Sequence, residues 1–194
     1  THLHSEPQFT YNMVVIHTTS KSKVVFHMDG DAFFVACEVA KNPKLRGLPV
    51  VTGEERGIVS ALSYEAKALG VTRGLPIFTL RKKFPQVLVL PGDYLSYARY
   101  SRMMFEIVKR YADEVEEYSI DECFAEITGL QRPLRMSYEK IAEKIKAELD
   151  KELGFTFSAG LAPNKVVAKL GSKWKKPSGL TIIPGYKIHE YIKD

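Results

Sequence analysis

Cysteine is scarce in this chain of 194 residues, which contains only Cys37 and Cys123. Two thiols cannot build a zinc cluster or a disulfide framework, and they favour a reduced, cytoplasmic setting. Long apolar runs are missing as well. Runs such as VLVL at residues 87–90 are far too short to cross a bilayer, so we expect no membrane partner.

Several enzyme signatures are also absent: the sequence has no P-loop, no nucleophile elbow and no Rossmann fingerprint. What is present is material for a folded core, because 45% of the residues are hydrophobic and 11% are aromatic. That composition excludes a disordered or low-complexity chain. Lys and Arg exceed Asp and Glu by 28 to 23, for a net charge of +5. Such a balance favours a polyanionic partner, although basic proteins of other kinds are common.

Hydrophobic periodicity and turn residues divide the chain into elements. Residues 1–22 are polar and are expected to be a flexible N-terminal extension, with one apolar stretch at 13–16 that could add an edge strand. Between residues 45 and 92, glycine and proline separate short strands (49–52, 57–62) from short helices (63–69, 77–83). The other expected elements are strands at 24–28, 115–120, 122–127, 155–161 and 180–183, and helices at 32–41, 93–112, 138–153 and 163–174.

If residues 45–92 are an insertion, the remainder is a strand–helix–strand–strand–helix–strand unit, which is the ferredoxin-like βαββαβ arrangement of the α+β (mixed α/β) class. Right-handed crossovers then place the third strand beside the first and antiparallel to it. Asp29, at the end of the first strand, should therefore lie beside Asp121 and Glu122, at the start of the third. The topology predicts three carboxylates at one edge of the sheet.

Three neighbouring carboxylates repel one another unless cations compensate them. Oxygen donors without His or Cys suit Mg²⁺, with Mn²⁺ as an alternative. Two such ions about 3.5–4 Å apart serve in-line displacement at phosphorus. The ordinary interpretation is that Asp29-Gly30-Asp31 is only a turn with a helix cap and that Asp121-Glu122 is a solvated hairpin tip.

Basic residues gather after the strand at 155–161. Residues 164–176 contain five lysines and no acid. The strand leads away from the carboxylate edge and the following helix leads back, so Lys176 should lie near the carboxylates. For Lys165 and Lys169 a merely solvated basic face is an equally good interpretation. Tyr64 and Lys67, one helical turn apart, offer a further hydroxyl and ammonium group.

Five sequence blocks occur in an order that closely resembles the Y-family translesion DNA polymerases, in particular the polymerase IV and polymerase kappa branch. The resemblance extends over residues 24–183. The blocks are FHMDGDAFF at 26–34, YEAK at 64–67, YSIDE at 118–122, AGLAPNK at 159–165 and KPSG at 176–179.

The resemblance implies that residues 23–44 and 93–194 form a catalytic palm and residues 45–92 the fingers. It also implies that Asp29, Asp121 and Glu122 are catalytic and bind two Mg²⁺ ions together with the Gly30 carbonyl. Five residues match positions that bind the incoming nucleotide: Phe33, Phe34, Tyr64, Lys67 and Lys176. Phe34 matches the steric gate that excludes a ribose 2′-hydroxyl. The position of Lys67 is usually Arg in this family, and Lys cannot form the bidentate phosphate contact.

The family's thumb and little finger follow the region that ends at Asp194, and we expect both to be absent here. Most phosphate contacts to duplex DNA would be missing with them, so DNA binding should be weak and salt-dependent. The resemblance implies primer–template DNA and deoxynucleoside triphosphates as partners, and a sliding clamp as a candidate through segments beyond this chain. It places the protein in the cytoplasm, at the nucleoid if the source is bacterial.

The leading hypothesis is therefore a template-directed DNA polymerase core that transfers a deoxynucleotide to a primer 3′-hydroxyl. A second hypothesis is a palm-like module that binds nucleotides or proteins without catalysis. A third is a nucleotide cyclase, which uses a similar palm and two metals on a free triphosphate. The Phe33-Phe34 pair and the Ser119-Ile120-Asp121-Glu122 tetrapeptide favour the polymerase.

Overall fold

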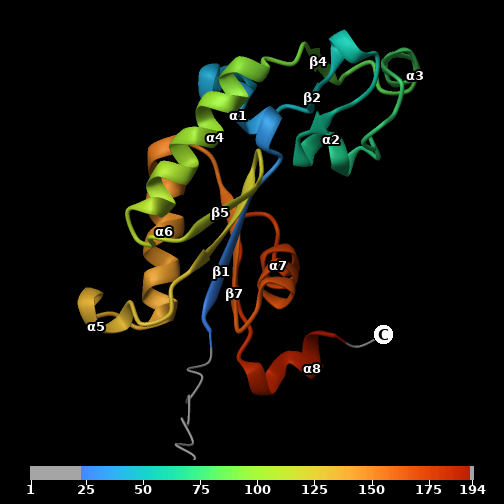
Figure 1. Ribbon diagram of the computed structural model, residues 1–194. Helices are drawn as coiled ribbons and strands as arrows, with labels where there is room; N and C mark the ends of the chain where they lie inside the picture. The colour runs from blue at the N-terminus through green and yellow to red at the C-terminus, as the bar shows by residue number, and fades with distance from the viewer. Residues whose placement is uncertain (1–22, 193–194) are drawn as a thin grey trace, which may run out of the picture.

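The computed structural model of the chain describes residues 23–192, so the predicted N-terminal extension lies outside the described residues. These residues form a mixed α/β structure with two sheets, one of five strands and one of three (Figure 1). Within the described part of the chain, no helix combines the length and the apolar character that a membrane crossing requires.

The larger sheet has the order β5-β6-β1-β7-β8. Its central strand β1 runs antiparallel to both β6 and β7, and β8 is parallel to β7. Strands β5, β6, β1 and β7 have the ferredoxin-like order that the sequence predicts. Strand β8 adds a fifth strand at the edge of the sheet. The bounds are β1 Val25–Gly30, β5 Val115–Ser119, β6 Glu122–Glu126, β7 Phe157–Ala162 and β8 Leu180–Ile182.

Both faces of this sheet are covered by helices. On one face lie α1 (Phe33–Lys41), α4 (Tyr94–Lys109) and α6 (Tyr138–Leu153), and on the other lies α7 (Lys165–Trp174) (Figure 1). Alternate residues of β1 serve the two sides: Phe26 and Met28 join the core under α4 and α6, whereas Val25 packs with Val167 and Ala168 of α7. Two-sided burial explains why β1 is an almost continuous apolar run.

The smaller sheet is built from the inserted residues and has the order β3-β2-β4. Its strands are β2 (Val50–Thr52), β3 (Ala61–Leu62) and β4 (Leu88–Leu90), and the helices of this unit are α2 (Tyr64–Ala68) and α3 (Ile77–Lys83). It has a core of its own, which includes Val51, Val59, Ala66, Val71 and Leu80. A further apolar cluster of Val35, Val50 and Ala61 joins it to α1.

The predicted boundaries differ from the structure in several places. The strand predicted at 57–62 shrinks to Ala61–Leu62, because Ile58 forms only an isolated bridge with Pro76. Strand β4 was not predicted, since its parallel partner β2 lies far away in sequence and leaves no local signal. The short elements that were also missed are η1 (Pro43–Leu45), η2 (Glu54–Arg56), α5 (Gln131–Leu134), η3 (Gly185–Lys187) and α8 (Ile188–Tyr191).

Helix α7 approaches the sheet closely because Gly160 of β7 has no side chain. A Cβ at Gly160 would fall on the carbonyl oxygen of Ala168 and within 2.6 Å of the Ser172 backbone nitrogen. Gly171 of α7 faces this point, and a Cβ on it would lie 3.3 Å from the Cα of Gly160. The helix that carries the lysine-rich segment is therefore fixed against β7 by backbone contact.

We predict that Gly160→Ala lowers the free energy of unfolding by about 1–3 kcal/mol or more, because overpacking must push α7 away from the sheet. Urea denaturation of the variant and the parent measures the difference. Gly171→Ala is the matched control and should cost less, since its nearest contacts are 3.3–3.4 Å. Equal stability of Gly160→Ala and the parent would contradict this account of the β7–α7 contact.

Candidate active site

The three predicted carboxylates lie at the same end of the larger sheet. In the β1–β6 pair, Asp29 is directly opposite Glu122. The Gly30 N–H donates a hydrogen bond of 2.8 Å to the Asp121 carbonyl oxygen, which ties the end of β1 to the hairpin turn. Ile120 and Asp121 form that turn between β5 and β6, and the Ser119 hydroxyl donates to Asp121 Oδ1 at 2.8 Å. Strand register therefore brings these acids together.

A cleft of about 630 Å³ lies between this sheet edge and the inserted unit. It is lined by three acids (Asp29, Asp121 and Glu122) and by four basic residues (Lys67, Arg73, Lys173 and Lys176). Of the nine residues that the sequence analysis singled out, eight line this cleft: Asp29, Gly30, Phe33, Tyr64, Lys67, Asp121, Glu122 and Lys176. The ninth, Phe34, lines an adjoining recess of about 180 Å³ that also includes Asp121.

Two lysines hold the carboxylates in this structure. Lys176 Nζ lies 2.5 Å from Asp29 Oδ1, and Lys169 Nζ lies 2.9 Å from Glu122 Oε1. The buried His27 Nε2 lies 3.2 Å from the other Glu122 oxygen. Burial lowers the pKa of His27 to about 4, so its ring is neutral near pH 7. Burial also opposes charge on Lys169, yet its hydrogen bond and ion pair with Glu122 leave the pKa of Lys169 above the usual value.

Asp121 is the least compensated of the three acids. Burial raises the pKa of Asp121, and the neighbouring charges of Asp29 and Glu122 raise it further, although the Ser119 hydrogen bond opposes the shift. A divalent cation would offset this repulsion between carboxylates. The donor set consists only of oxygen atoms, which is the ligand type that Mg²⁺ and Mn²⁺ prefer. Within residues 23–192, however, no three acidic, His or Cys side chains are gathered closely enough to hold one ion together.

The first turn of α1 also faces the cleft. Ala32 caps the helix in a left-handed conformation, with φ of 48°, and offers no side-chain hydrogen bond to it. The first N–H groups of a helix lack intrahelical acceptors and favour anions. The Phe34 ring is held beside them by Tyr97, which stacks on it with centroids 4.4 Å apart, and by the edge of Tyr94.

The structure adds residues to the site that the sequence analysis did not select. Arg73 lines both the cleft and the recess, and Lys173 lines the cleft. Arg73 lies in the loop after α2, where no periodicity indicates which way a side chain points. Lys173 follows Lys169 by four residues in α7, and that helical spacing on a basic helix was the available signal. Lys169, treated as equally compatible with a solvated face, contacts Glu122 directly.

Comparisons with known proteins agree with this geometry. Residues 28–173 match the model of the impB/mucB/samB family. The chain therefore belongs to the impB/mucB/samB family, which confirms the resemblance to Y-family DNA polymerases. DNA polymerase IV of Desulfatibacillum aliphaticivorans is 42% identical over 171 residues, which cover 87% of this chain and 43% of that relative. DNA polymerase IV 1 of Bacillus subtilis is 40% identical over 176 residues, covering 89% of this chain and 42% of the relative.

Solved structures give the same answer for the fold. DinB from Sulfolobus solfataricus superposes with a TM-score of 0.79 at 30% identity, covering 87% of this chain and 50% of that one. The insertion ternary complex of Dbh DNA polymerase gives a TM-score of 0.78 at 29% identity, over 87% of this chain and 51% of its own. The chain thus spans about half the length of the relatives it matches, or somewhat less.

We predict that, in EDTA, the free energy of unfolding of Asp121→Asn is no more than about 0.5 kcal/mol below that of the parent. The reason is that the change removes a buried charge that two neighbouring acids repel. The same variant should lose Mn²⁺ binding, which electron paramagnetic resonance of free Mn²⁺ measures without any turnover. Glu117→Gln, an exposed acid of β5, is the control and should bind Mn²⁺ like the parent. Undiminished Mn²⁺ binding by Asp121→Asn would show that this acid is not a ligand.

Proposed function

We propose that this chain is the catalytic core of a template-directed DNA polymerase that acts in translesion synthesis. The observation that supports the proposal most strongly is the cleft itself, which brings Asp29, Asp121 and Glu122 together with basic residues of the inserted unit, of α7 and of the loop after α7. Such a combination suits a substrate that carries a triphosphate. The relatives named DNA polymerase IV support the same activity.

In this proposal Asp29, Asp121 and Glu122, with the Gly30 carbonyl, hold two Mg²⁺ ions, for which Mn²⁺ can substitute. The ions, when bound, supply activation of the primer 3′-hydroxyl and neutralisation of charge on the leaving pyrophosphate. The carboxylates also orient the attacking hydroxyl toward the α-phosphate. Lys176, which contacts Asp29, is placed to exchange that carboxylate for a phosphate oxygen when the nucleotide enters.

The other groups would hold the nucleotide. The backbone N–H groups of Phe33 and Phe34 and the hydroxyl of Tyr64 are donors for phosphate oxygens. Lys67 acts as a point charge, which binds phosphate with less geometric selectivity than an arginine would. Arg73 and Lys173 add positive charge to the same wall. Phe34, fixed by Tyr97, would occupy the space that a ribose 2′-hydroxyl needs.

The division into subdomains is part of the proposal: residues 45–92 act as fingers, and residues 23–44 and 93–194 as the palm. The insertion ternary complex of Dbh is a structure of a related polymerase, which favours primer–template DNA and deoxynucleoside triphosphates as partners here. A sliding clamp, a cytoplasmic or nucleoid location and a role in DNA repair follow from the family relationship alone.

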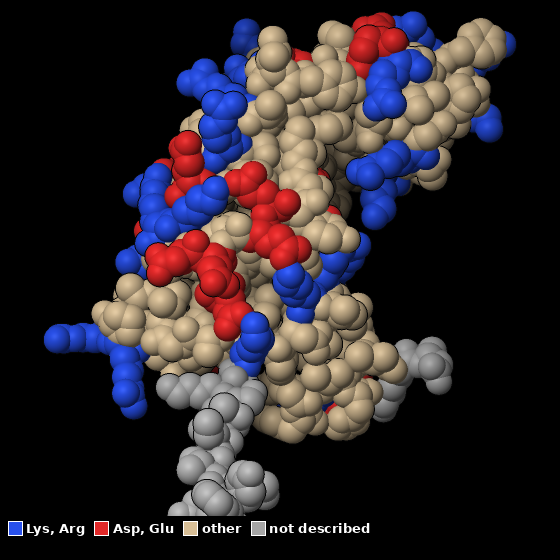
Figure 2. Space-filling view, viewed as in Figure 1, with Lys and Arg blue, Asp and Glu red and all other residues tan. Residues whose placement is uncertain are grey.

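Surface charge indicates where the DNA backbone would lie. Figure 2 shows acidic side chains gathered over β5 and β6, where Glu116 and Glu117 are exposed. Lys165 and Lys109 pair with these two acids and neutralise them only in part, so this strand is a poor surface for phosphates. We expect the backbone instead on the side of Lys67, Arg73 and Lys173. So few phosphate contacts imply weak binding, and its salt dependence should be shallow because the slope scales with the number of phosphates neutralised.

We predict that the chain extends a primer at low salt with Mg²⁺ and all four deoxynucleotides, and that Asp121→Ala slows extension at least about a thousandfold. Metal stabilisation of the transition state is worth several kcal/mol, and each 1.36 kcal/mol is tenfold in rate. Single-turnover extension measures both rates, with Glu117→Gln as the control. Equal extension by the parent and Asp121→Ala would refute the catalytic assignment. A parent that binds nucleotide and Mg²⁺ without extension would instead favour a non-catalytic module.

We predict that Phe34→Ala reduces discrimination against ribonucleotides by about tenfold or more, because removing the ring opens space beside the sugar. The ratio of kcat/KM for a deoxynucleotide and its ribonucleotide measures the effect. Phe78→Ala is the matched control, since Phe78 is 70% exposed on α3, away from the residues that line the cleft. An unchanged ratio in Phe34→Ala would show that this side chain is not the gate.

A further inference from the structure

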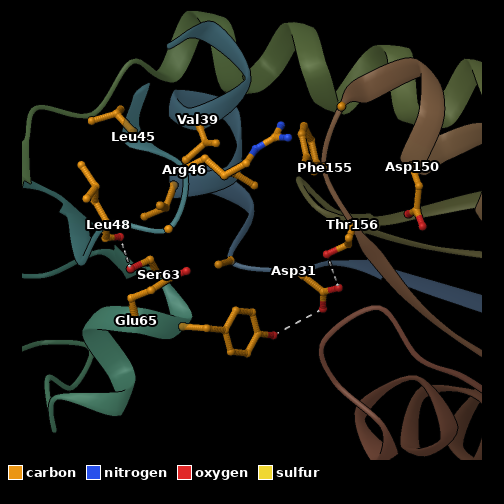
Figure 3. Close-up of a pocket in the computed structure, with 16 residues that line it drawn as sticks. Asp31, Val39, Leu45, Arg46, Leu48, Ser63, Glu65, Asp150, Phe155 and Thr156 are labelled. Carbon is orange, nitrogen blue, oxygen red and sulfur yellow. Dashed lines mark hydrogen bonds between the residues drawn. The ribbon is translucent and has the colours of Figure 1, made fainter. Parts of the chain in front are cut away.

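Asp31 is a buried carboxylate to which the proposed reaction gives no role. It follows Asp29 by two residues, yet it lines a different hollow, a pocket of about 610 Å³ that shares Ala32, Ser63 and Tyr64 with the cleft (Figure 3). Only 2% of its side-chain surface is exposed, compared with 14% for Asp29. Burying a carboxylate is costly unless donors surround it.

Donors from three separate parts of the chain surround Asp31. Its side-chain oxygens accept hydrogen bonds from the Ser158 hydroxyl at 2.8 Å, the Thr156 hydroxyl at 2.9 Å and the Ser178 backbone N–H at 2.7 Å. The Tyr64 hydroxyl and the Lys176 ammonium each lie 3.4 Å from Oδ1. An ionised carboxylate is an acceptor at both oxygens and so suits a shell made only of donors, whereas an amide would turn its NH₂ toward some of them.

Some of these contacts come from the main sheet, and the others come from the inserted unit and from a loop. Thr156 precedes β7 and Ser158 lies within it, and the backbone N–H of Asp31 also donates to the Thr156 carbonyl at 3.1 Å, so Asp31 is anchored to the main sheet. Tyr64 begins α2 in the inserted unit. Lys176 and Ser178 lie in the loop between α7 and β8. Helix α2 and this loop, which are far apart in the sequence, therefore both contact Asp31.

Tyr64 and Lys176 are also the two proposed triphosphate ligands that Asp31 contacts directly. Burial, and then the charge of Asp31, raises the pKa of the Tyr64 hydroxyl, which therefore remains a donor at neutral pH. Ser178 holds a left-handed backbone, with φ of 58°, while its N–H donates to Asp31. The loop that carries Lys176 is thus shaped by the same carboxylate.

We propose that Asp31 is a positioning residue that fixes Tyr64 and Lys176 relative to each other and ties the inserted unit to the main sheet. The positioning of Tyr64 and Lys176 for a nucleotide rests on the proposed function. The structural tie, which is the connection between the inserted unit and the main sheet through Asp31, does not rest on it. Asp31 contacts no reacting atom, so its effect belongs to nucleotide binding and not to the chemical step.

The test uses Asp31→Asn, which keeps the volume of the side chain, and the double variant Thr156→Val/Ser158→Ala, which keeps the carboxylate but removes two of its donors. We expect the KM for the deoxynucleotide to rise at least tenfold in Asp31→Asn, with a smaller change in kcat and unchanged affinity for primer–template. The double variant, which loosens the anchor of Asp31 but keeps its carboxylate, should lose thermal stability and raise KM by less than Asp31→Asn does. If both variants lose stability and neither changes KM, Asp31 is only structural and the proposal is wrong.

A double-mutant cycle makes the coupling specific. Tyr64→Phe should raise KM in the parent and add little in the Asp31→Asn background, because the hydroxyl has already lost its fixed position. Full additivity of the two effects would overturn the proposal.

A third measurement does not depend on polymerase activity. Amide hydrogen exchange of α2 should speed up in both Asp31→Asn and Tyr64→Phe, and to a smaller extent in the double variant. Tyr64→Phe removes only a hydroxyl, so it keeps the test valid even if Asp31→Asn fails to fold. Unchanged exchange in Tyr64→Phe would overturn the structural tie. Faster exchange in a chain that extends no primer would retain the tie and reject the proposed function.

Discussion

Repulsion among three carboxylates at one end of a sheet is the constraint on which the rest of this structure depends. Register places Asp29 opposite Glu122, and the hairpin turn adds Asp121, so the fold creates a concentration of negative charge that it must compensate. Compensation arrives from α7 and the loop after it, as Lys169 and Lys176. Asp121 pairs with neither lysine, and burial, together with the charges of Asp29 and Glu122, raises the pKa of its carboxyl.

The position of those lysines depends on the backbone packing of α7 against β7. Helix α7 can bring its lysines to the sheet edge only if it lies close to β7, and the missing side chain of Gly160 allows that approach. A helix held a few ångströms further away would leave Glu122 without its ammonium partner. The ion pairs at the cleft therefore depend on the backbone packing of α7 against β7. The AGLAPNK block provides both, because it contains the end of the strand, the turn and the start of the helix.

The sequence predicts the parts of this arrangement that follow from topology. The strand–helix order with right-handed crossovers suffices to place Asp29 beside Asp121 and Glu122, and the lengths of β7 and α7 suffice to return Lys176 to them. It does not predict β4, because a three-residue strand in a parallel pair has no local signature. Nor does it reveal Arg73, whose place in the cleft depends on how a loop folds over the inserted unit.

The role of Asp31 could not be predicted from the Asp29-Gly30-Asp31 motif alone. Asp-Gly-Asp after a strand is usually a turn, and nothing local distinguishes an acid that faces water from one that accepts hydrogen bonds from Tyr64, Thr156 and Ser178. The two acids nevertheless lie in different environments, because the chain leaves β1 at Gly30 and turns into α1 through the left-handed Ala32. Asp29 lines the cleft, whereas Asp31 lines the neighbouring pocket and is surrounded by hydrogen-bond donors. A three-residue turn can thus present one carboxylate to the cleft and direct the other toward Tyr64, Ser178 and Lys176.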